Sequence, residues 1–370
     1  MPRFSRRSFL HLSAAASAAA AFRVISEPTL AAAARHNRPA PAGAVVIDSN
    51  ENPLGPCAAA RAAMASILPE GGRYLDNLTD DLAGAFAQAE GLSPDYVRVT
   101  VGSTPALSLA VLAFTSPQRS YVTADPCFET GMMMADKNGA RVVKVPLTKT
   151  YAHDVRAMLA AGPDAGVFYV CNPNNPTGSL TPHEDIEYLT ANQPEGSIVL
   201  VDEAYLHFSG APSTIDLVKA GKDVVVLRTF SKVYGMAGVR CGLLVARPEL
   251  AEKVMARGGY NFMPITAVVA ASASLKDPNL VAERRRINAT VRQKTFDWLG
   301  RNGYAYIPSE ANCFLVDVRR PGKEVREAMA KENVLVGRTW PIMPNHLRVT
   351  VGTEEEMERF QAAFQKVMKS

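Results

Sequence analysis

Short apolar runs, rich in valine and bounded by turn residues, recur through the first two thirds of the chain. Between several of them, as in 105–114 and 183–191, apolar residues fall at helical spacing. Strands that are apolar at every position are typical of sheets buried on both faces, and alternation with helices is typical of parallel sheets. We therefore predict an α/β fold with a mostly parallel central sheet. Its strands are expected at 97–101, 120–123, 141–145, 166–170, 197–201, 223–227 and 239–246.

The pattern changes after about residue 259, where helices come before strands. This order predicts a second, smaller α+β domain. Its helices are expected at 266–275, 279–301 and 353–367, and its strands at 313–318 and 347–351. We expect the chain to divide into a leader at 1–34, a linker and N-terminal arm at 35–60, a large domain at 61–260 and a small domain at 261–370.

The leader begins MPRFSRRSFLHLSAAASAAAAF. Arg6 and Arg7 precede an alanine-rich run to residue 22, which is shorter than the roughly 20 apolar residues that cross a bilayer. Small residues at 31–34 offer a cleavage site. These features predict a twin-arginine signal peptide and export to the periplasm or beyond in a folded state. The alternative is a basic, alanine-rich start on a cytoplasmic protein.

Charge and cysteine usage exclude several classes of protein. The net charge is +4, but four of the forty basic residues lie in the leader, so the remainder is nearly neutral and no nucleic-acid partner is expected. The five cysteines are far apart and form no Cys-x-x-Cys pair, so neither a disulfide framework nor a metal site is expected. The uncharged stretch 99–118 contains Gly102 and Pro105, so we expect a strand, a turn and a buried helix rather than a membrane span.

Polar segments directly follow four of the predicted strands. In open α/β sheets, ligands bind beyond the carboxyl ends of the strands. The segments therefore predict one site built from distant parts of the sequence. They are 102–107 (GSTPAL), 172–178 (NPNNPTG), 202–205 (DEAY) and 228–240 (RTFSKVYGMAGVR).

Each segment offers a distinct chemistry. Gly102 allows a tight turn, after which Ser103 and Thr104 present hydroxyl and N–H groups that can hold a phosphate, although any capped helix has this pattern. Asp202 ends an apolar run, where an unpaired carboxylate is costly, so we expect it to face a cationic partner. Lys232 follows a buried strand, and a lysine in a partly dry pocket has the lowered pKa that covalent amine chemistry needs.

The motifs NENPLGP at 50–56, NPNNPTG, DEAY and TFSKVYGMAGVRCG at 229–242 follow one another in this order. Together they resemble the motifs of the class I and II pyridoxal-phosphate aminotransferases of fold type I. The histidinol-phosphate aminotransferase-like branch fits them best, and the resemblance covers residues 45–370. It implies pyridoxal 5'-phosphate as cofactor and a large domain with a mostly parallel sheet, followed by a smaller α+β domain.

The resemblance also implies roles for individual residues. Lys232 matches the lysine that binds the cofactor covalently and moves the substrate proton. Asp202 matches the carboxylate that pairs with the pyridine nitrogen and keeps the ring cationic, so that it accepts electrons. Tyr205 and Asn175 match groups that hydrogen-bond the phenolic oxygen of the ring. The expected catalytic residues are Lys232, Asp202 and Tyr205.

Further positions match groups around the cofactor. Phosphate contacts are expected from Ser103, Thr104, Thr229, Ser231 and Arg240. Pro105 stands at a commonly acidic position, and Phe128 falls where an aromatic ring, often tyrosine, stacks on the cofactor. Tyr74 matches a tyrosine that reaches the cofactor phosphate of a neighbouring subunit, although Leu75 follows it where proline is usual. This match implies a homodimer with shared sites.

Substrate positions follow in the same way. Arg348 matches the arginine whose guanidinium forks onto the substrate α-carboxylate. Asn52 and Gly55 lie in an arm similar to the one that closes over the substrate. Arg338 lies near the second arginine of phosphate-specific members, although its spacing to Arg348 differs.

The expected reaction is transamination in two half-reactions. The amino donor is an amino acid or a histidinol-phosphate-like amine, and the acceptor is a 2-oxo acid. Because the leader implies export and histidinol phosphate is a cytosolic intermediate, aromatic or other amino acids stay open as donors. Racemisation, decarboxylation or carbon–sulfur lysis with the same cofactor is the alternative. The leader argues against an effector-binding module of a transcription regulator, and intact Lys232, Asp202 and Arg240 argue against a cofactor-free relative.

Overall fold

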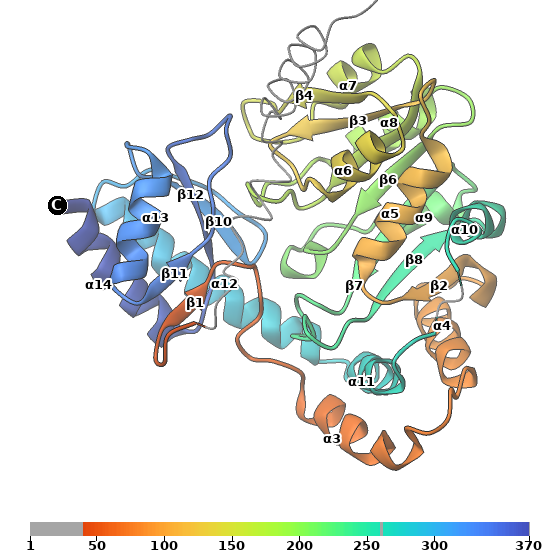
Figure 1. The fold of residues 1–370 in the computed structure, drawn as a ribbon, viewed down its shortest axis with the longest axis horizontal. Coiled ribbons are helices and arrows are strands. Elements are labelled where there is room, and N and C mark those ends of the chain that lie inside the picture. The colour runs from red at the N-terminus through yellow and green to blue at the C-terminus, as the bar shows by residue number, and fades with distance from the viewer. Residues whose placement is uncertain (1–39, 260–261, 370) are drawn as a thin grey trace, which may run out of the picture. The chain divides into compact units, whose positions relative to one another are not determined.

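The computed structural model describes residues 40–259 and 262–369 (Figure 1). The signal peptide expected at 1–34 lies outside the described residues. None of the helices in the described part is both long and apolar enough to cross a membrane.

A seven-stranded sheet forms the centre of the larger apolar cluster. The strand order is β2-β8-β7-β6-β5-β3-β4; five strands, β3 to β7, run parallel, whereas β8 is antiparallel to both of its neighbours. Every residue of β5, β6, β7 and β8 is buried, as in strands covered on both faces. The strands are β2 Val97–Thr100, β3 Ser120–Asp125, β4 Val142–Pro146, β5 Ala165–Cys171, β6 Ile198–Asp202, β7 Val224–Thr229 and β8 Gly242–Ala246. All seven coincide with predicted runs, so the predicted α/β fold is confirmed.

Helices cover this sheet. In Figure 1, α5 and α6 stand in front of the strands, and α10 packs beside α5. α7 packs on α8 and on β3 and β4. The bounds are α5 Ser103–Phe114, α6 Thr130–Lys137, α7 Val155–Ala161, α8 His183–Asn192, α9 Ile215–Lys219 and α10 Pro248–Met255. α5 and α8 correspond to the helices predicted at 105–114 and 183–191.

A second helical group packs at the β2 edge of the sheet, where α11 contacts α3 and α4, and α4 contacts β2. Cys57 caps α3, because its Sγ accepts a hydrogen bond from the N–H of Ala60. All five cysteines are free thiols, and four of them are buried. The bounds are α3 Ala58–Ile67, α4 Asn77–Glu90 and α11 Ile265–Leu275, with short 3-10 turns η1 Leu68–Glu70, η2 Pro94–Tyr96 and η3 Leu206–Phe208.

A separate apolar cluster lies in the C-terminal part of the chain. It contains an antiparallel sheet of order β12-β10-β9 and a parallel pair of β1 with β11. The elements are β1 Val45–Ile47, α12 Leu280–Arg301, β9 Tyr306–Ile307, β10 Cys313–Asp317, α13 Gly322–Lys331, β11 Val334–Val336, β12 His346–Thr350 and α14 Glu354–Lys369. The helices and strands predicted after residue 259 are all present. Segment 35–60, expected as linker and arm, contributes β1, because Val45 and Ile47 are buried in this cluster.

Candidate active site

The carboxyl ends of four strands bring the polar segments together. β5, β6 and β7 are parallel neighbours, so the segments that follow them begin at the same edge of the sheet. β6 ends at Asp202, and Lys232 lies shortly after the end of β7. β2 runs in the direction of β7, because β8 is antiparallel to both, and α5 therefore starts at this edge too.

The start of α5 is an open anion site. Gly102 precedes the helix with φ of 87°, and no side chain caps the first N–H groups. A Cβ atom at Gly102 would collide with the guanidinium of Arg240, and one at Gly242 would lie 2.5 Å from the backbone nitrogen of Ser103. Glycine at position 102 therefore lets Arg240 approach the helix start, and glycine at position 242 lets β8 approach the same backbone. The exposed N–H groups and the positive end of the helix dipole attract an anion there.

Hydroxyl groups and a cation surround this helix start. The Nη1 atom of Arg240 donates to the backbone oxygen of Ala237 at 2.8 Å and to Ser231 Oγ at 3.4 Å. Its Nη2 atom reaches the backbone oxygen of Val101, just before the helix, at 3.5 Å. Thr229 Oγ1 donates to Ser231 Oγ at 2.9 Å. Thr229, Ser231 and Arg240, three of the residues expected to contact a phosphate, thus lie beside the start of α5.

Asp202 is a buried acid, 4% exposed, at the end of β6. Its Oδ1 atom accepts a hydrogen bond from the N–H of Ala204 at 3.1 Å, and its Oδ2 atom accepts one from the hydroxyl of Tyr169 at 3.0 Å. Burial raises the pKa of Asp202 to about 6, although both hydrogen bonds act in the opposite direction. Within the described part of the chain, no side-chain cation forms an ion pair with Asp202. The carboxylate therefore suits a cationic ligand group.

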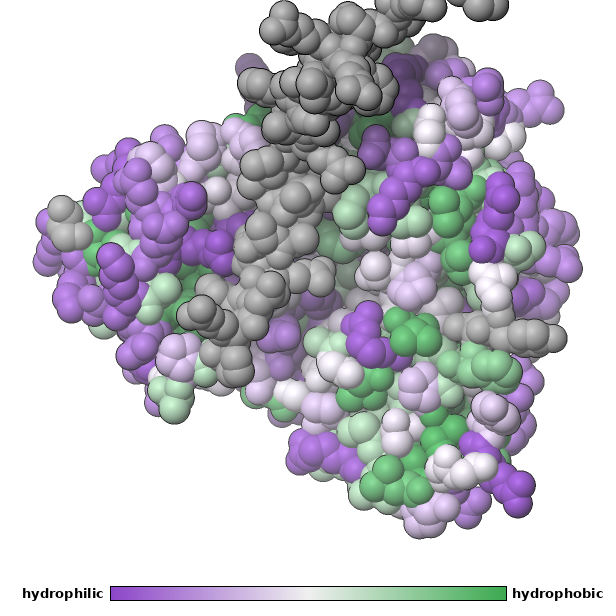
Figure 2. Space-filling view, in the orientation of Figure 1, coloured by the Kyte–Doolittle hydropathy of each residue, from purple (hydrophilic) through white to green (hydrophobic). Residues whose placement is uncertain are grey.

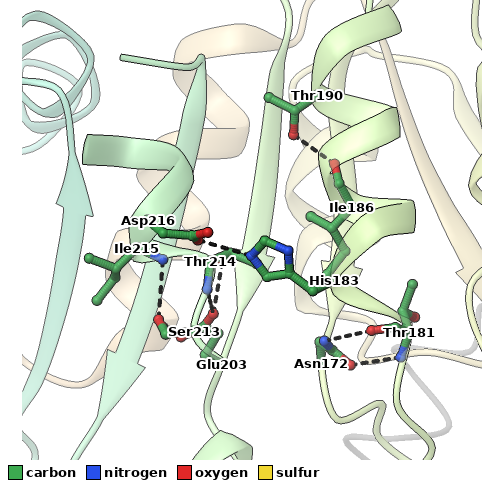
Figure 3. Close-up of polar contacts among 10 residues, drawn as sticks. All are labelled: Asn172, Thr181, His183, Ile186, Thr190, Glu203, Ser213, Thr214, Ile215 and Asp216. Carbon is green, nitrogen blue, oxygen red and sulfur yellow. Dashed lines mark hydrogen bonds and ion pairs between the residues drawn. The ribbon is translucent and has the colours of Figure 1, made fainter. Parts of the chain in front are cut away.

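The next residue, Glu203, anchors the segment that follows Asp202. It accepts hydrogen bonds from the N–H and hydroxyl of Thr214, at 2.7 and 2.8 Å, and from the Ser213 hydroxyl at 2.8 Å (Figure 3). It also forms a buried ion pair of 2.9 Å with Arg228 on β7. Consecutive carboxylates thus have different surroundings: one is paired internally, and the other faces the site.

Lys232 is held by the N-terminal arm. Its Nζ atom donates to the backbone oxygen of Asn50 at 2.9 Å and of Ser49 at 3.4 Å. The same atom lies 5.5 Å from the centre of the Tyr205 ring. Burial, and secondly the positive charge of Arg348, lower the pKa of Lys232 to about 8. More of the amine is therefore neutral near pH 7 than in an exposed lysine, and the neutral amine is the nucleophile and base.

Asn50 joins the arm to this group and is 1% exposed. Its Nδ2 atom donates to the hydroxyl oxygen of Tyr205 at 3.0 Å, so the hydroxyl keeps its proton for another acceptor. Its N–H donates to Thr350 Oγ1 at 2.9 Å, and its carbonyl accepts from Asn312 Nδ2 at 3.1 Å. The sequence analysis missed Asn50 and Asn312. The signal for Asn50 was its place as first residue of NENPLGP.

The loop at 172–178 is held by its own asparagines. Asn172 and Thr181 exchange two hydrogen bonds, from Asn172 Nδ2 to the Thr181 carbonyl at 3.1 Å and from the Thr181 N–H to Asn172 Oδ1 at 2.9 Å (Figure 3). Asn174 Nδ2 donates to the Pro126 carbonyl at 3.1 Å, which ties the loop to the segment of Phe128. Phe128 is half-buried in that segment. The loop therefore has one defined shape.

Arg348 on β12 connects to this loop. Its Nη1 atom donates to Asn175 Oδ1 at 3.0 Å, and its Nη2 atom donates to the backbone oxygen of Asp48 at 2.6 Å. Asn175 uses its oxygen on the arginine, so its amide nitrogen provides the donors for a ligand. The Arg348 guanidinium also lies 5.5 Å from the centre of the Trp340 ring.

Arg338 contacts the same tryptophan, and its guanidinium carbon lies 4.0 Å from the centre of the Trp340 ring. It forms an ion pair with Glu129, and the two side chains are only 13% and 7% exposed. Glu129, which the sequence analysis missed, directly follows Phe128. The positive charge of Arg338 is therefore neutralised by a carboxylate of the protein itself, that of Glu129.

Asn52 and Gly55 pack against the segment after Lys232. Asn52 Nδ2 donates to the backbone oxygen of Val233 at 3.0 Å. A Cβ atom at Gly235 would collide with the backbone oxygen of Gly55. These contacts fix the arm against the lysine segment through backbone atoms of Val233 and Gly55.

Tyr74 lies on the surface and is 72% exposed. Its ring centre is 4.9 Å from that of Phe262, which is 52% exposed. Figure 2 shows that hydrophobic residues gather over the corner that α3, α4 and α11 form at the bottom of the view. Leu68, 64% exposed, belongs to the same part of the chain.

The site fits a flat aromatic cofactor with a cationic ring nitrogen and a phosphate. A buried acid without a cation, Asp202, suits the ring nitrogen, and the anion site at α5 suits the phosphate. Lys232 adds an amine of lowered pKa. No group of His, Cys, Asp and Glu side chains able to hold a metal ion occurs among residues 40–259 and 262–369. Residues with perturbed pKa values at the carboxyl ends of strands mark a candidate catalytic site.

The family model described as "Aminotransferase class I and II" matches residues 43–364. The chain therefore belongs to the class I and II aminotransferases, and it is a pyridoxal-phosphate-dependent transaminase of fold type I. The expectations of transamination and of this cofactor are confirmed.

Particular relatives are similar over most of the chain. Histidinol-phosphate aminotransferase 1 of Nitrosococcus oceani is 35% identical over 334 residues, 88% of this chain and 90% of the relative. Histidinol-phosphate aminotransferase of Symbiobacterium thermophilum is 37% identical over 332 residues, with 88% and 90% coverage. The crystal structure of histidinol-phosphate aminotransferase from Sinorhizobium meliloti in complex with pyridoxal-5'-phosphate is 26% identical, with a TM-score of 0.81, and covers 88% of this chain and 91% of that chain.

Proposed function

We propose that the protein transfers an amino group from an amino acid or a histidinol-phosphate-like amine to a 2-oxo acid, with Lys232 and Asp202 as central catalytic residues. One observation carries the proposal: an amine of lowered pKa and a buried acid without a cation follow neighbouring strands, beside the anion site at the start of α5. An acid and an amine whose environments shift their pKa values in opposite directions are the groups that such chemistry needs.

The residues have distinct proposed roles around the cofactor. When bound, pyridoxal phosphate withdraws the electron pair that proton loss leaves on the substrate Cα and stores the amino group between half-reactions. Lys232 holds the cofactor, and Asp202 keeps its ring nitrogen protonated. Tyr205 and Asn175 donate to its phenolic oxygen, and Phe128 stacks on its ring. The phosphate is held by Ser103, Thr104, Thr229, Ser231 and Arg240.

Lys232 and Arg348 handle the substrate. The Nζ atom of Lys232, with a pKa of about 8, accepts the Cα proton of the bound amine. Arg348 binds the anionic group of the substrate through its fork, which Asn175 orients. Asn52 and Gly55 hold the arm against the lysine segment, so we assign them to the substrate site through the position of the arm.

Two classes of donor are supported by different observations. The names of the relatives support a histidinol-phosphate-like amine. Because Arg338 is already paired with Glu129, the site favours an amino acid with an aromatic or other neutral side chain. In the first case Arg338 also contacts the substrate phosphate, and in the second it stays paired with Glu129.

A half-reaction screen tests the proposal. Purified enzyme loaded with pyridoxal phosphate is mixed with histidinol phosphate or with single amino acids, without acceptor, and the near-ultraviolet and visible spectrum is followed. At least one donor should convert the cofactor to its amine form, and a 2-oxo acid should reverse the change. The Lys232→Ala variant should turn over several orders of magnitude more slowly. If donors are decarboxylated or racemised while no keto product forms, the alternative chemistry replaces transamination.

We further propose a homodimer in which Tyr74 reaches the cofactor phosphate of the neighbouring subunit. The exposed aromatic pair of Tyr74 and Phe262, together with exposed Leu68, supports an association surface at this corner. Exposed apolar residues that gather on one face are typical of interaction sites.

The location and the domain division are also proposals. The sequence around Arg6 and Arg7 supports export through the twin-arginine route, with the cytoplasm as alternative. The two separate apolar clusters support a large and a small domain, with α11 of the predicted small domain packed in the larger cluster.

A further inference from the structure

Tyr169 donates a hydrogen bond to the acid that we propose for the cofactor ring. Its hydroxyl lies 3.0 Å from Asp202 Oδ2, and the tyrosine is fully buried. Tyr169 lies on β5, where Cys171 pairs with Asp202 of β6. Because both strands are in the interior of the sheet, the backbone fixes the position from which each side chain starts.

The ring of Tyr169 has little freedom to turn away. The fully buried ring of Tyr121 on β3 stacks on it, with ring centres 6.0 Å apart and an interplanar angle of 27°. Tyr121 is itself confined, because any side chain at position 131 would collide with its hydroxyl. Close packing on a rigid strand therefore aims the Tyr169 hydroxyl at the carboxylate.

The other charged or titratable groups near Asp202 do not replace this contact. They are the phenol of Tyr121, the thiols of Cys127 and Cys171, and the amine of Lys232. Lys232 is the only cation among them, and its effect on Asp202 is smaller than that of burial or of the two hydrogen bonds. Neutral donors, the Tyr169 hydroxyl and the Ala204 N–H, thus provide most of the stabilisation that the carboxylate receives.

The protonation states agree with this assignment. Burial, and secondly the negative charge of Asp202, raise the pKa of Tyr169 well above its usual range, so its hydroxyl stays a donor. Burial raises the pKa of Asp202 to about 6, and the Tyr169 hydrogen bond limits that rise. A hydrogen bond to a charged group changes such an equilibrium by about tenfold or more. Without it, the pKa of Asp202 would rise further, and a larger share of the carboxyl would be protonated near neutral pH.

We propose that Tyr169 is a positioning residue for transamination, whose hydroxyl keeps Asp202 ionised and aimed at the ring nitrogen of the cofactor. Tyr169 acts through Asp202, and the inference rests on the role proposed above for that acid. An ionised Asp202 holds a protonated ring nitrogen. A protonated Asp202 can only donate to an unprotonated nitrogen, which draws electrons less strongly from the substrate.

The test titrates Asp202 first in the full chain without cofactor. The protein is made with ¹³C-labelled aspartate, and the Asp202 carboxyl signal is identified by its loss in Asp202→Asn. In Tyr169→Phe we expect the midpoint of this signal to move upward by about one pH unit or more. The matched control is Tyr121→Phe, which removes a neighbouring buried hydroxyl that does not bond Asp202, and it should leave the midpoint unchanged.

Difluorotyrosine at position 169 keeps the ring and strengthens the donor, so it should move the midpoint downward even if Tyr169→Phe folds poorly. In the holoenzyme, the acid limb of the half-reaction rate should move in the same directions. Equal midpoints in Tyr169→Phe and the unaltered chain, or an equal shift in Tyr121→Phe, would overturn the proposal. Because the first titration uses no cofactor or substrate, this outcome is distinct from failure of the proposed function, which normal transamination by Asp202→Asn would indicate.

Discussion

The Nη1 atom of Arg348 lies 3.0 Å from Oδ1 of Asn175, and this hydrogen bond joins β12 to the loop that follows β5. The arginine is expected to bind the substrate and the asparagine the cofactor, so one contact orients both groups. Groups that are oriented in advance reduce the entropic cost of binding and of reaction. A change at either residue should therefore affect the binding of both substrate and cofactor.

Arg348→Lys keeps the positive charge but removes the planar fork. We expect KM for a donor with an α-carboxylate to rise by about 10- to 100-fold, with a smaller change in kcat, because a hydrogen bond to a charged group is lost. Steady-state kinetics measure the effect. Arg359→Lys, at an exposed arginine that donates to the Gly43 carbonyl, is the matched control. An unchanged KM in Arg348→Lys would remove this residue from the substrate site.

Asp202→Asn keeps the shape of the side chain but removes its negative charge. The activation free energy of the proton-transfer step in the half-reaction should rise by about 3 kcal/mol. This is the size of the contribution that other preorganised electrostatic contacts make. Rapid mixing with a donor measures that step directly. A variant that transaminates at the normal rate would show that the acid does not support the ring nitrogen.

The same variant should stabilise the protein when the cofactor has been removed. Burial raises the pKa of Asp202 to about 6 in the folded chain, above roughly 3.9 in the unfolded chain. Between these values the folded chain binds more protons, so stability falls as pH rises from about 4 to 6, by up to about 3 kcal/mol. Asp202→Asn has no carboxyl group at this position, so its stability should not fall in this way as the pH rises.

Urea unfolding of the cofactor-free protein at two pH values checks this prediction. Asp202→Asn should be more stable than the unaltered chain at pH ~7.5, and the two should be nearly equal at pH ~3, because Asp202 is then mostly protonated in both the folded and the unfolded chain. Asp95→Asn, at an exposed acid, is the control and should show no such difference. A gain that persists unchanged at the lower pH would point to a cause other than the charge.

Two inactive variants should restore activity when mixed, if the sites are shared between subunits. Lys232→Ala and Tyr74→Phe each impair both sites of their own homodimer. In a mixed dimer, one site carries an intact lysine and an intact tyrosine, so part of the activity should return after the subunits exchange. Light scattering gives the mass of the assembly. An active monomer, or no recovery after proven exchange, would refute the shared site.

Export should depend on Arg6 and Arg7. In the native host, the full-length chain should reach the periplasm, and Arg6→Lys with Arg7→Lys should retain it in the cytosol. Fractionation with a cytosolic marker measures the distribution. A control that changes Arg23 to lysine should be exported normally. A leader-bearing protein found only in the cytosol would show that the leader is not an export signal.

Much of the fold could be read from the sequence because its signals are local. Buried strands are mostly apolar, as in Gly242–Ala246, and seven valine-rich runs formed the central sheet. The cofactor chemistry was readable for a similar reason. Lys232 and Asp202 each follow a strand within a dense motif, and the rule that ligands bind at strand ends brings them together without coordinates.

Other features depend on contacts between residues far apart in the chain. β1 was missed because three residues, Val45–Ile47, carry little pattern, and their partner β11 lies near the other end of the chain. Glu129 looks like an ordinary polar residue until the fold brings Arg338 to it.

The sequence by itself determined the sheet, the family and the residues that we propose for the chemistry, because each is a local pattern of apolar spacing or a motif. The tertiary structure decided which neighbouring groups set the pKa values of those residues. The pKa of Lys232 and of Asp202 depends on burial and on donors such as Tyr169, which reach them from other strands. Tyr169 lies in an apolar run that predicts only a buried strand. Its hydroxyl acquires a role because β5 and β6 are neighbours in the folded sheet.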